Sequence, residues 1–148
     1  MDSSSNYSIS SEPSRLQLDF IIRSLQTTYW AKHRSEAMIR EAVRRSLCFG
    51  VYSNSDDTQV GFARVVSDGV TCSWLCDVFI DPAHRGRGLG RAVVAEALRH
   101  PAVAGTTFHL GTQDAHGLYE KFGFVRVETM RRPASPIPAA VEISNSRI

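Results

Sequence analysis

Hydrophobic positions change their spacing several times along the chain, and each change predicts a new element. Leu16, Leu18 and Phe20 alternate with polar neighbours, which predicts a short first strand at 16–20. Two helices are expected next, at 19–28 and 37–45, because apolar side chains recur there at helical spacing. Residues 1–14 are rich in serine and carry no apolar repeat, so we expect a disordered leader there.

The middle of the chain is richer in strands. Apolar runs at 47–53, 59–67 and 70–80 are separated by turn residues and predict three consecutive strands. Helical spacing returns at 89–99. A strand at 106–110, a short helix around Tyr119 with Asp114 as its N-cap, and a last alternating strand at 124–130 complete the pattern. This order predicts an α/β fold with a mixed sheet, in one domain over 15–132 with a tail at 133–148.

A glycine-rich turn joins the strand at 70–80 to the central helix. Pro82 ends the strand, and the turn that follows contains Arg85, Gly86, Arg87, Gly88, Leu89, Gly90 and Arg91. Glycine lets the backbone approach a ligand closely, and the first N–H groups of a helix lack partners and carry the positive end of its dipole. Arginine side chains add a charge and a geometry that suit phosphate oxygens. The turn therefore predicts a phosphate or diphosphate site.

Two common phosphate motifs are excluded by the spacing. A Walker loop needs a Lys-Ser/Thr pair after its last glycine, and the dinucleotide fingerprint needs a glycine where Arg91 stands.

The formal charge of +2, from 17 basic and 15 acidic residues, and the absence of a basic run with aromatics argue against nucleic acid. No stretch approaches a membrane span. Three cysteines without metal-ligand spacing, of which Cys72 and Cys76 are expected in the core, favour a reducing, cytoplasmic setting without a bound metal.

Two patches resemble the GCN5-related N-acetyltransferase (GNAT) superfamily. The first is Arg-x-x-Gly-x-Gly after a strand that ends in Pro82, which looks like the coenzyme A pyrophosphate loop. The second runs from Ala115 through Tyr119 to Phe124 and resembles the family's late helix, Ala-x-x-x-Tyr-x-x-x-Gly-Phe. The resemblance covers residues 47–130 and implies the acyl-CoA N-acyltransferase fold, a central, mostly antiparallel mixed sheet flanked by helices.

The resemblance also implies roles for individual residues. Main-chain groups of Val78, Phe79 and Ile80 would pair with the pantetheine arm of acetyl-CoA, and the N–H groups of Arg85, Gly86, Arg87, Gly88, Leu89 and Gly90 would cradle the pyrophosphate. Tyr119 matches the family's general acid, and a core tyrosine is the alternative. Asp77 is the candidate general base, with His109 and His116 as rivals, although its carboxylate could equally bond neighbouring backbone. The family often has an asparagine where Thr112 stands, so that contact is not expected here.

The function expected from the resemblance is direct transfer of an acetyl group from acetyl-CoA to a primary amine of a small molecule or peptide. The alternatives are a coenzyme A-binding regulatory module with little catalysis and an acyltransferase for another acceptor. Tyr29 and Trp30 could line the acceptor pocket, although packing of the first helix on the sheet explains them as well. No nucleic acid or membrane partner is expected, and the protein would act as a monomer or homodimer.

Overall fold

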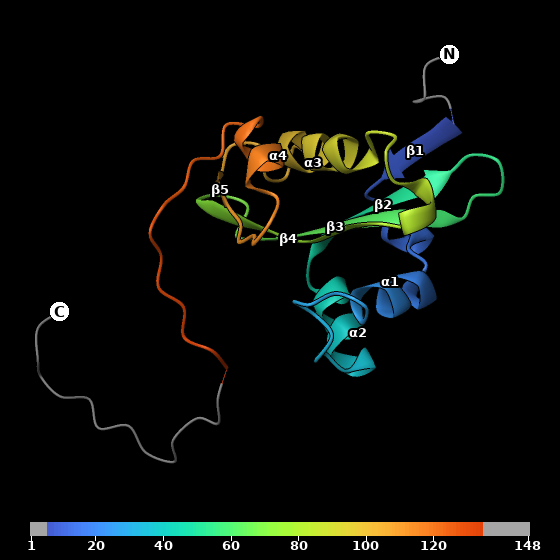
Figure 1. Ribbon diagram of the computed structural model, residues 1–148, viewed down its shortest axis with the longest axis horizontal. Coiled ribbons are helices and arrows are strands. Elements are labelled where there is room, and N and C mark those ends of the chain that lie inside the picture. Colours follow the sequence, from blue (N-terminus) through green and yellow to red (C-terminus); the bar gives the residue numbers. More distant parts are fainter. Residues whose placement is uncertain (1–5, 135–148) are drawn as a thin grey trace, which may run out of the picture.

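The computed structural model describes residues 6–134, which form one sheet with helices on both faces (Figure 1). The strands are β1 (Tyr7–Ser10), β2 (Leu47–Ser53), β3 (Gln59–Ser67), β4 (Cys72–Ile80) and β5 (Thr107–His109). The helices are α1 (Leu18–Leu25), α2 (Glu36–Arg44), α3 (Leu89–Arg99) and α4 (His116–Glu120), with single 3-10 turns η2 (Pro13–Arg15) and η3 (Pro82–His84). The expected α/β class and mixed sheet are confirmed.

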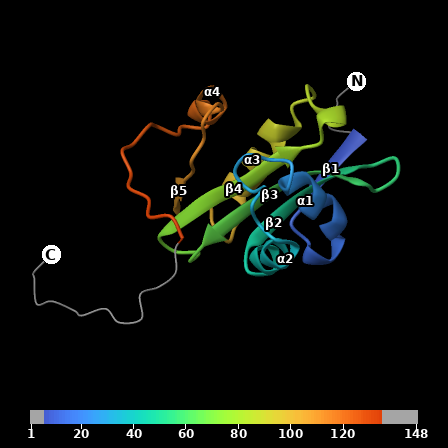
Figure 2. The same ribbon diagram turned by 60° about the horizontal axis from the view of Figure 1, so that its bottom comes forward.

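The strands lie in the order β1-β2-β3-β4-β5. Neighbours from β1 to β4 are antiparallel, and β5 runs parallel to β4. Helices α3 and α4 cover one face of the sheet and α1 and α2 cover the other, as Figures 1 and 2 show from two directions. A parallel pair needs a crossover connection, and α3 supplies it between β4 and β5.

Each face of the sheet has its own hydrophobic cluster. Under α3, the buried side chains of that helix meet those of the central strands, including Val93, Val94, Phe49 and Val65. On the opposite face, α1 and α2 pack on the sheet through a cluster that contains Ile21, Leu25, Ile39, Val43 and Phe62. The helical spacing of the apolar residues in α1 and α2 gives both helices one buried stripe.

Strand β4 contains an irregularity that positions the site. Its register with β3 shifts between Phe62 and Arg64, and opposite that shift Asp77 has a φ of +55°, in the left-handed region. The alternation of side chains between the two faces of the sheet is therefore shifted by one residue after Asp77. Val78 and Ile80 pack on the α3 side, whereas Phe79 packs on the α1–α2 side.

Strands β4 and β5 pair only at the start of β4. The paired residues are Cys72, Ser73 and Trp74 on β4, and β5 ends at His109. In the described part of the chain, the remainder of β4 has β3 as its only strand neighbour. This edge of β4, from Leu75 to Ile80, is open to an extended ligand.

Several expectations from the sequence were wrong. Residues 16–20 form no strand, since α1 begins at Leu18, and the first strand is β1 at Tyr7–Ser10, inside the segment expected to be a disordered leader. Residues 1–5 and most of the tail expected at 133–148 lie outside the described residues. Residues 124–130 form no strand. They lead away from the sheet (Figure 1), and Val125 and Val127 are exposed.

Two smaller expectations also failed. The N-cap of α4 is Ala115 and not Asp114, and the cap makes no side-chain hydrogen bond. The hydroxyl oxygen of Thr112 instead accepts a hydrogen bond from the Ala115 N–H at 3.0 Å. Cys72 and Cys76 are only half-buried, so neither belongs to the core.

Candidate active site

The glycine-rich turn forms an open cradle at the start of α3. Gly86 and Gly88 both have a φ of +78°, and Gly88 is the N-cap of the helix. A Cβ atom at either position would meet no described atom within 4 Å, so the space above these glycines is free. Gly90 differs because it already lies inside α3, where a Cβ atom would make only an ordinary contact with Ile80 at 3.9 Å. Two of the three glycines thus shape the turn itself.

The first turn of α3 directs unpaired N–H groups into this cradle. The first intrahelical bond runs from the Ala92 N–H to the Gly88 carbonyl at 3.0 Å, which leaves the N–H groups of Leu89, Gly90 and Arg91 without helical partners. An anion placed there would satisfy these donors and interact favourably with the helix dipole.

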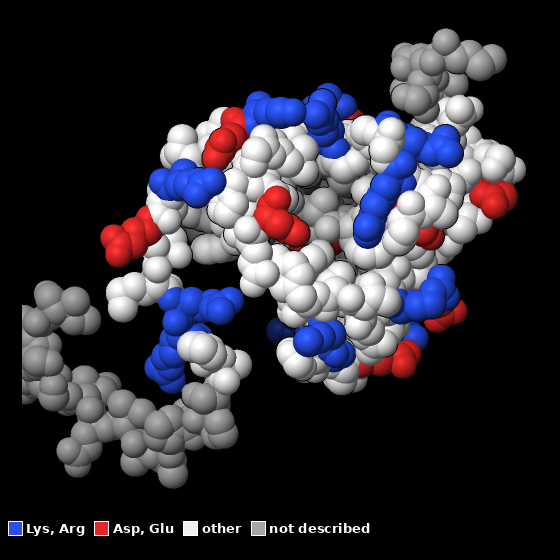
Figure 3. Space-filling view, viewed as in Figure 1, with Lys and Arg blue, Asp and Glu red and all other residues white. Residues whose placement is uncertain are grey.

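The arginines of the turn differ in their contacts. Arg85 donates from Nε to the Ile80 carbonyl at 2.9 Å, and its guanidinium lies 5.5 Å from the centre of the Phe79 ring, so it holds the turn to the end of β4. Arg87 and Arg91 are exposed, and neither is among the hydrogen-bonded or ion-paired residues of the described chain. Their charges are available to a ligand. Figure 3 shows a hollow below α3 with basic side chains along its upper and right rim.

Tyr119 lies on α4 and packs against the same hydrophobic cluster as Val78 and Ile80. Its ring meets Phe124 edge-on at 5.8 Å. Burial raises the pKa of the Tyr119 phenol above its ordinary value, and electrostatic interactions with Asp114 and with Tyr29 raise it further. The hydroxyl is therefore protonated throughout the neutral range.

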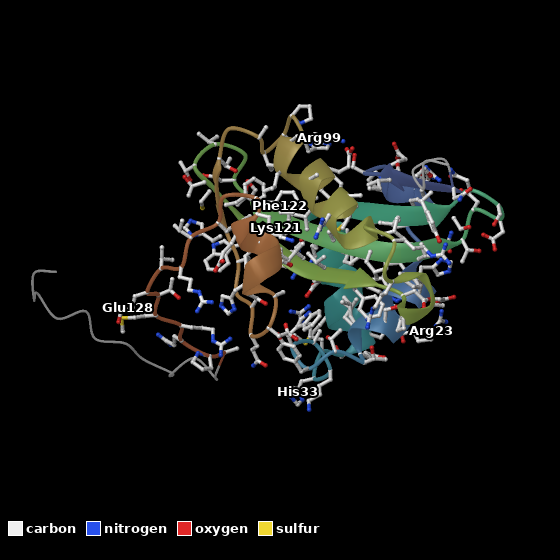
Figure 4. All side chains as sticks on the ribbon, turned by 45° about the horizontal axis from the view of Figure 1, so that its top comes forward. Arg23, His33, Arg99, Lys121, Phe122 and Glu128 are labelled. Atoms are coloured by element: carbon white, nitrogen blue, oxygen red, sulfur yellow. The ribbon has the colours of Figure 1, made fainter. Side chains whose placement is uncertain are left out.

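The short helix that carries Tyr119 ends in a turn that contains Gly123. Gly123 has a φ of +88°, and the N–H groups of Phe122, Gly123 and Phe124 bond back to carbonyls of the helix. Phe122 is one of the partly buried residues packed on the cluster beneath α3. Figure 4 shows it beside Lys121 at the end of α4, next to α3. These contacts fix the position of α4 and with it Tyr119.

Asp77 is surrounded by donors. Its Oδ1 accepts from Trp30 Nε1 at 3.0 Å and from Arg34 Nη1 at 3.0 Å, while its Oδ2 accepts from the same Arg34 nitrogen and from Arg64 Nε, both at 2.8 Å. The side chain is only 2% exposed. A carboxylate has about four lone-pair sites, and four hydrogen bonds occupy them. This geometry does not support Asp77 as the base that collects a proton from the amine.

The two histidines considered as alternative bases have ordinary surroundings. His109 stacks on Trp74 with the ring centres 5.1 Å apart. His116 is the first residue of α4 and is half-buried. His33, in the segment between α1 and α2, lies at the outer side of the molecule in Figure 4.

Tyr29 and Trp30 lie in the segment between α1 and α2. They are 45% and 39% exposed, and their rings meet edge-on at 4.9 Å. Trp30 is hydrogen-bonded to Asp77 on β4, next to Val78, and Val78 packs on the same cluster as Tyr119, so the aromatic pair lies near the part of β4 that Tyr119 approaches. Sequence reasoning missed Arg34 and Arg64. A buried carboxylate after a run of apolar residues could have prompted a search for arginine partners, but their positions along the chain did not identify them.

A separate polar cavity of about 510 Å³ lies between α1, α2 and the start of β3. Its lining includes Arg23, Arg40, Gln59 and Asp81, and neither Tyr119 nor the glycines of the turn contribute to it. Within residues 6–134, no cluster of three or more His, Cys, Asp or Glu side chains could hold a metal ion. In the same range no helix is long and apolar enough to cross a bilayer.

The comparison with known protein families identifies the fold. The model of the acetyltransferase (GNAT) domain matches residues 44–126, from the end of α2 to beyond α4. The chain belongs to the GNAT acetyltransferase family. The glycine turn and Tyr119 both lie inside the matched range, in agreement with the resemblance of these two stretches of the sequence to the family.

Individual GNAT relatives agree with this assignment. The crystal structure of a protein from Xanthomonas campestris pv. campestris, described as a GNAT-family acetyltransferase, is 40% identical, covers 86% of this chain and 93% of its own, and has a TM-score of 0.82. A protein of Gibberella zeae named as an acetyltransferase is 35% identical over 64% of this chain. An uncharacterized protein of Mycobacterium leprae is 33% identical over 67% of this chain. The match spans 65% and 29% of the lengths of these two curated relatives.

Proposed function

We propose that this protein transfers an acetyl group from acetyl-CoA directly to a primary amine of a small molecule or peptide. The observation that supports the proposal most strongly is the joint presence of two features in the region where β4 leads into α3. The glycine cradle offers unpaired N–H groups, and β4 leaves an open edge beyond Trp74. A coenzyme A molecule has a diphosphate for the first and an amide-containing arm for the second.

Each part of the site would serve one part of the cosubstrate. N–H groups between Arg85 and Gly90 would hold the diphosphate, and the exposed Arg87 would add its charge. Main-chain groups of Val78, Phe79 and Ile80 would pair with the pantetheine arm as another strand would. Because β5 does not pair with β4 beyond Trp74, backbone N–H groups of this edge are free to bind the developing oxyanion of the thioester carbonyl, and the bulge at Asp77 changes the direction in which neighbouring residues point.

Tyr119 would act on the leaving thiolate. Its raised pKa keeps the hydroxyl protonated, so it can donate a hydrogen bond or a proton to the sulfur as the C–S bond breaks. The attacking amine must be neutral, and an amine with a pKa of about 10.4 is neutral in roughly one molecule in a thousand at pH 7. With Asp77 engaged by its four donors, ordered water is our candidate for removing the proton. Transfer within a ternary complex needs no acyl-enzyme, and none of the three cysteines is placed as a carrier.

The acceptor pocket would lie between α4 and the segment that carries Tyr29 and Trp30. The exposed faces of these two rings are suited to hold the body of an amine while its nitrogen faces the thioester. The expected monomer or homodimer and the cytoplasmic setting stay predictions, as does the domain boundary at 15–132.

The proposal is tested by two measurements on the full chain. Titration calorimetry with coenzyme A should show saturable binding, and release of free thiol from acetyl-CoA should accelerate with at least one member of a panel of amines and amino-terminal peptides. The absence of binding at millimolar coenzyme A would overturn the proposal. Binding without thiol release for any amine would instead favour the alternative, a coenzyme A-binding module that keeps the fold.

A further inference from the structure

The four hydrogen bonds at Asp77 connect parts of the chain that are distant in sequence. Trp30 and Arg34 belong to the segment between α1 and α2, Arg64 belongs to β3, and Asp77 itself forms the bulge of β4. The segment of residues 26–35 is irregular and carries the exposed Tyr29. It is therefore attached to the sheet partly through this one carboxylate.

The groups that bind Asp77 from the sheet and from the segment differ in burial. The Arg64 side chain is 11% exposed and donates from Nη1 to the hydroxyl of Ser46 as well, so Asp77 and Arg64 form a fixed base within the sheet. The Arg34 side chain is 28% exposed and Trp30 is 39% exposed. A fixed carboxylate that binds two groups from a more exposed segment determines where that segment lies.

We propose that Asp77 is a positioning residue, which holds residues 29–34 beside Tyr119 and thereby shapes the acceptor pocket. The inference rests on the proposed acetyl transfer, and it assigns Asp77 a role different from that of a general base. Trp30 is held directly through its indole N–H, and Tyr29 is held through its neighbour and through the edge-on contact between their rings.

The same geometry explains why loss of the Asp77 hydrogen bonds should weaken binding of the acceptor amine and not binding of coenzyme A. The glycine cradle is held to the sheet by other contacts, which include the Arg85 bond to the Ile80 carbonyl and a 2.8 Å hydrogen bond between the Tyr7 hydroxyl and His84 Nδ1. None of these involves Asp77. Loss of the attachment should therefore loosen the acceptor side and leave coenzyme A binding intact.

Arg34 is the side chain to change, because removing it leaves the buried pair of Asp77 and Arg64 in place. Both of its bonds to Asp77 come from a single nitrogen, so a lysine ammonium can replace that nitrogen in Arg34→Lys. Arg34→Met removes the charge and keeps most of the apolar stem. Arg45→Met is the matched control, since Arg45 also pairs with one carboxylate, that of Glu41, but both side chains are exposed at the end of α2.

Two readouts test the proposal. The chain has two tryptophans, so in a Trp74→Phe background the fluorescence reports Trp30 alone. Arg34→Met should roughly double the quenching of Trp30 by acrylamide, as expected for local opening of the segment. With the amine that the unaltered protein acetylates fastest, Arg34→Met should raise KM for the amine by about tenfold, the equivalent of one charge-assisted hydrogen bond, with kcat nearly unchanged.

The remaining variants distinguish a positioning role from a general loss of stability. Arg34→Lys should restore both readouts, Arg45→Met should change neither, and the Kd for coenzyme A should stay the same in all three. Unchanged quenching in Arg34→Met would overturn the proposal, as would a rise in quenching with no change in KM for the amine. If the unaltered protein acetylates no amine, the proposed function fails and the acceptor role of Asp77 fails with it, while the quenching result still shows whether the carboxylate holds the segment.

Discussion

Arg64 donates from Nε to Oδ2 of Asp77 at 2.8 Å, and both side chains are withdrawn from solvent, with exposures of 11% and 2%. This ion pair joins β3 to β4 at the bulge, where the backbone of Asp77 adopts a φ of +55°. Charges removed from water are costly unless they remain paired. The stability of the irregular part of β4 therefore depends on the carboxylate of Asp77.

Asp77→Asn should destabilise the fold by about 3 kcal/mol, because it leaves Arg64 and Arg34 without a carboxylate in a buried setting. Denaturant unfolding measures this loss. Asp57→Asn is a closely matched control. Asp57 also has a positive φ, at +61°, and also pairs with an arginine, Arg15, but its side chain is 77% exposed. Asparagine tolerates this backbone region, so Asp57→Asn should cost less than about 1 kcal/mol. Equal losses in both variants would show that the buried pair does not stabilise the bulge.

Gly88→Ala should weaken coenzyme A binding more than it weakens the fold. The backbone strain of an alanine at a φ of +78° costs about 1 kcal/mol, and the new methyl group would stand in the open cradle where a diphosphate would lie. We expect the Kd to rise by about tenfold or more. Gly69→Ala provides the comparison, because Gly69 has a φ of +77° in the turn between β3 and β4, away from the cradle. A similar loss of affinity in Gly69→Ala would attribute the effect to stability and not to the cradle.

Strands β2, β3 and β4, helix α3 and the glycine turn could be predicted from the sequence because their signals are local. Each has a sustained hydrophobic period, and each is bounded by turn residues or by Pro82. The glycine cradle and Tyr119 follow from the same local patterns. Their places in the fold are those expected from the sequence, and their roles in binding and catalysis stay predictions.

The parts that could not be predicted depend on distant partners. Strand β1 contains only Tyr7 and Ile9 as large apolar residues, and its pairing with β2 and the bond from Tyr7 to His84 hold it in place. Residues 124–130 show the reverse case, since their alternation is that of a strand and no described strand pairs with them. The surroundings of Asp77 come from residues 13, 43 and 47 positions away, so local spacing carried no sign of them.

Cys48 should make the fold sensitive to alkaline pH. Burial raises the pKa of its thiol to about 12, whereas in the unfolded chain the thiol titrates near pH 8.5. The folded state therefore favours the protonated form, and its stabilising contribution is complete below pH 8.5 and is lost as pH rises toward 12. Between pH 8 and 10 the loss from this thiol should reach about 2 kcal/mol.

Cys48→Ala should lower stability at pH 7, because it leaves a small cavity, and should flatten this pH dependence. Chemical unfolding at a series of pH values measures both effects. Cys76→Ala is the comparison: burial raises the pKa of the Cys76 thiol as well, but Cys76 is only half-buried, so its removal should flatten the pH dependence less than Cys48→Ala does. A slope that persists unchanged in Cys48→Ala would assign the alkaline sensitivity to other groups.

Tyr119→Phe should slow acetyl transfer by about 10²-fold without changing the affinity for coenzyme A, because it removes one donor for the leaving thiolate and no contact to the diphosphate. Burial raises the pKa of Tyr119 above its ordinary value, so the hydroxyl stays protonated between pH 7 and 9 and its loss should lower kcat uniformly over that range. Tyr52→Phe is the control, since Tyr52 is 1% exposed on β2 and its hydroxyl has no hydrogen-bond partner within the described chain. Free-thiol release should be the same in Tyr52→Phe as in the unaltered protein, and its stability should be equal or slightly higher. An unchanged kcat in Tyr119→Phe would place this hydroxyl outside the reaction and leave the thiolate to be protonated by solvent.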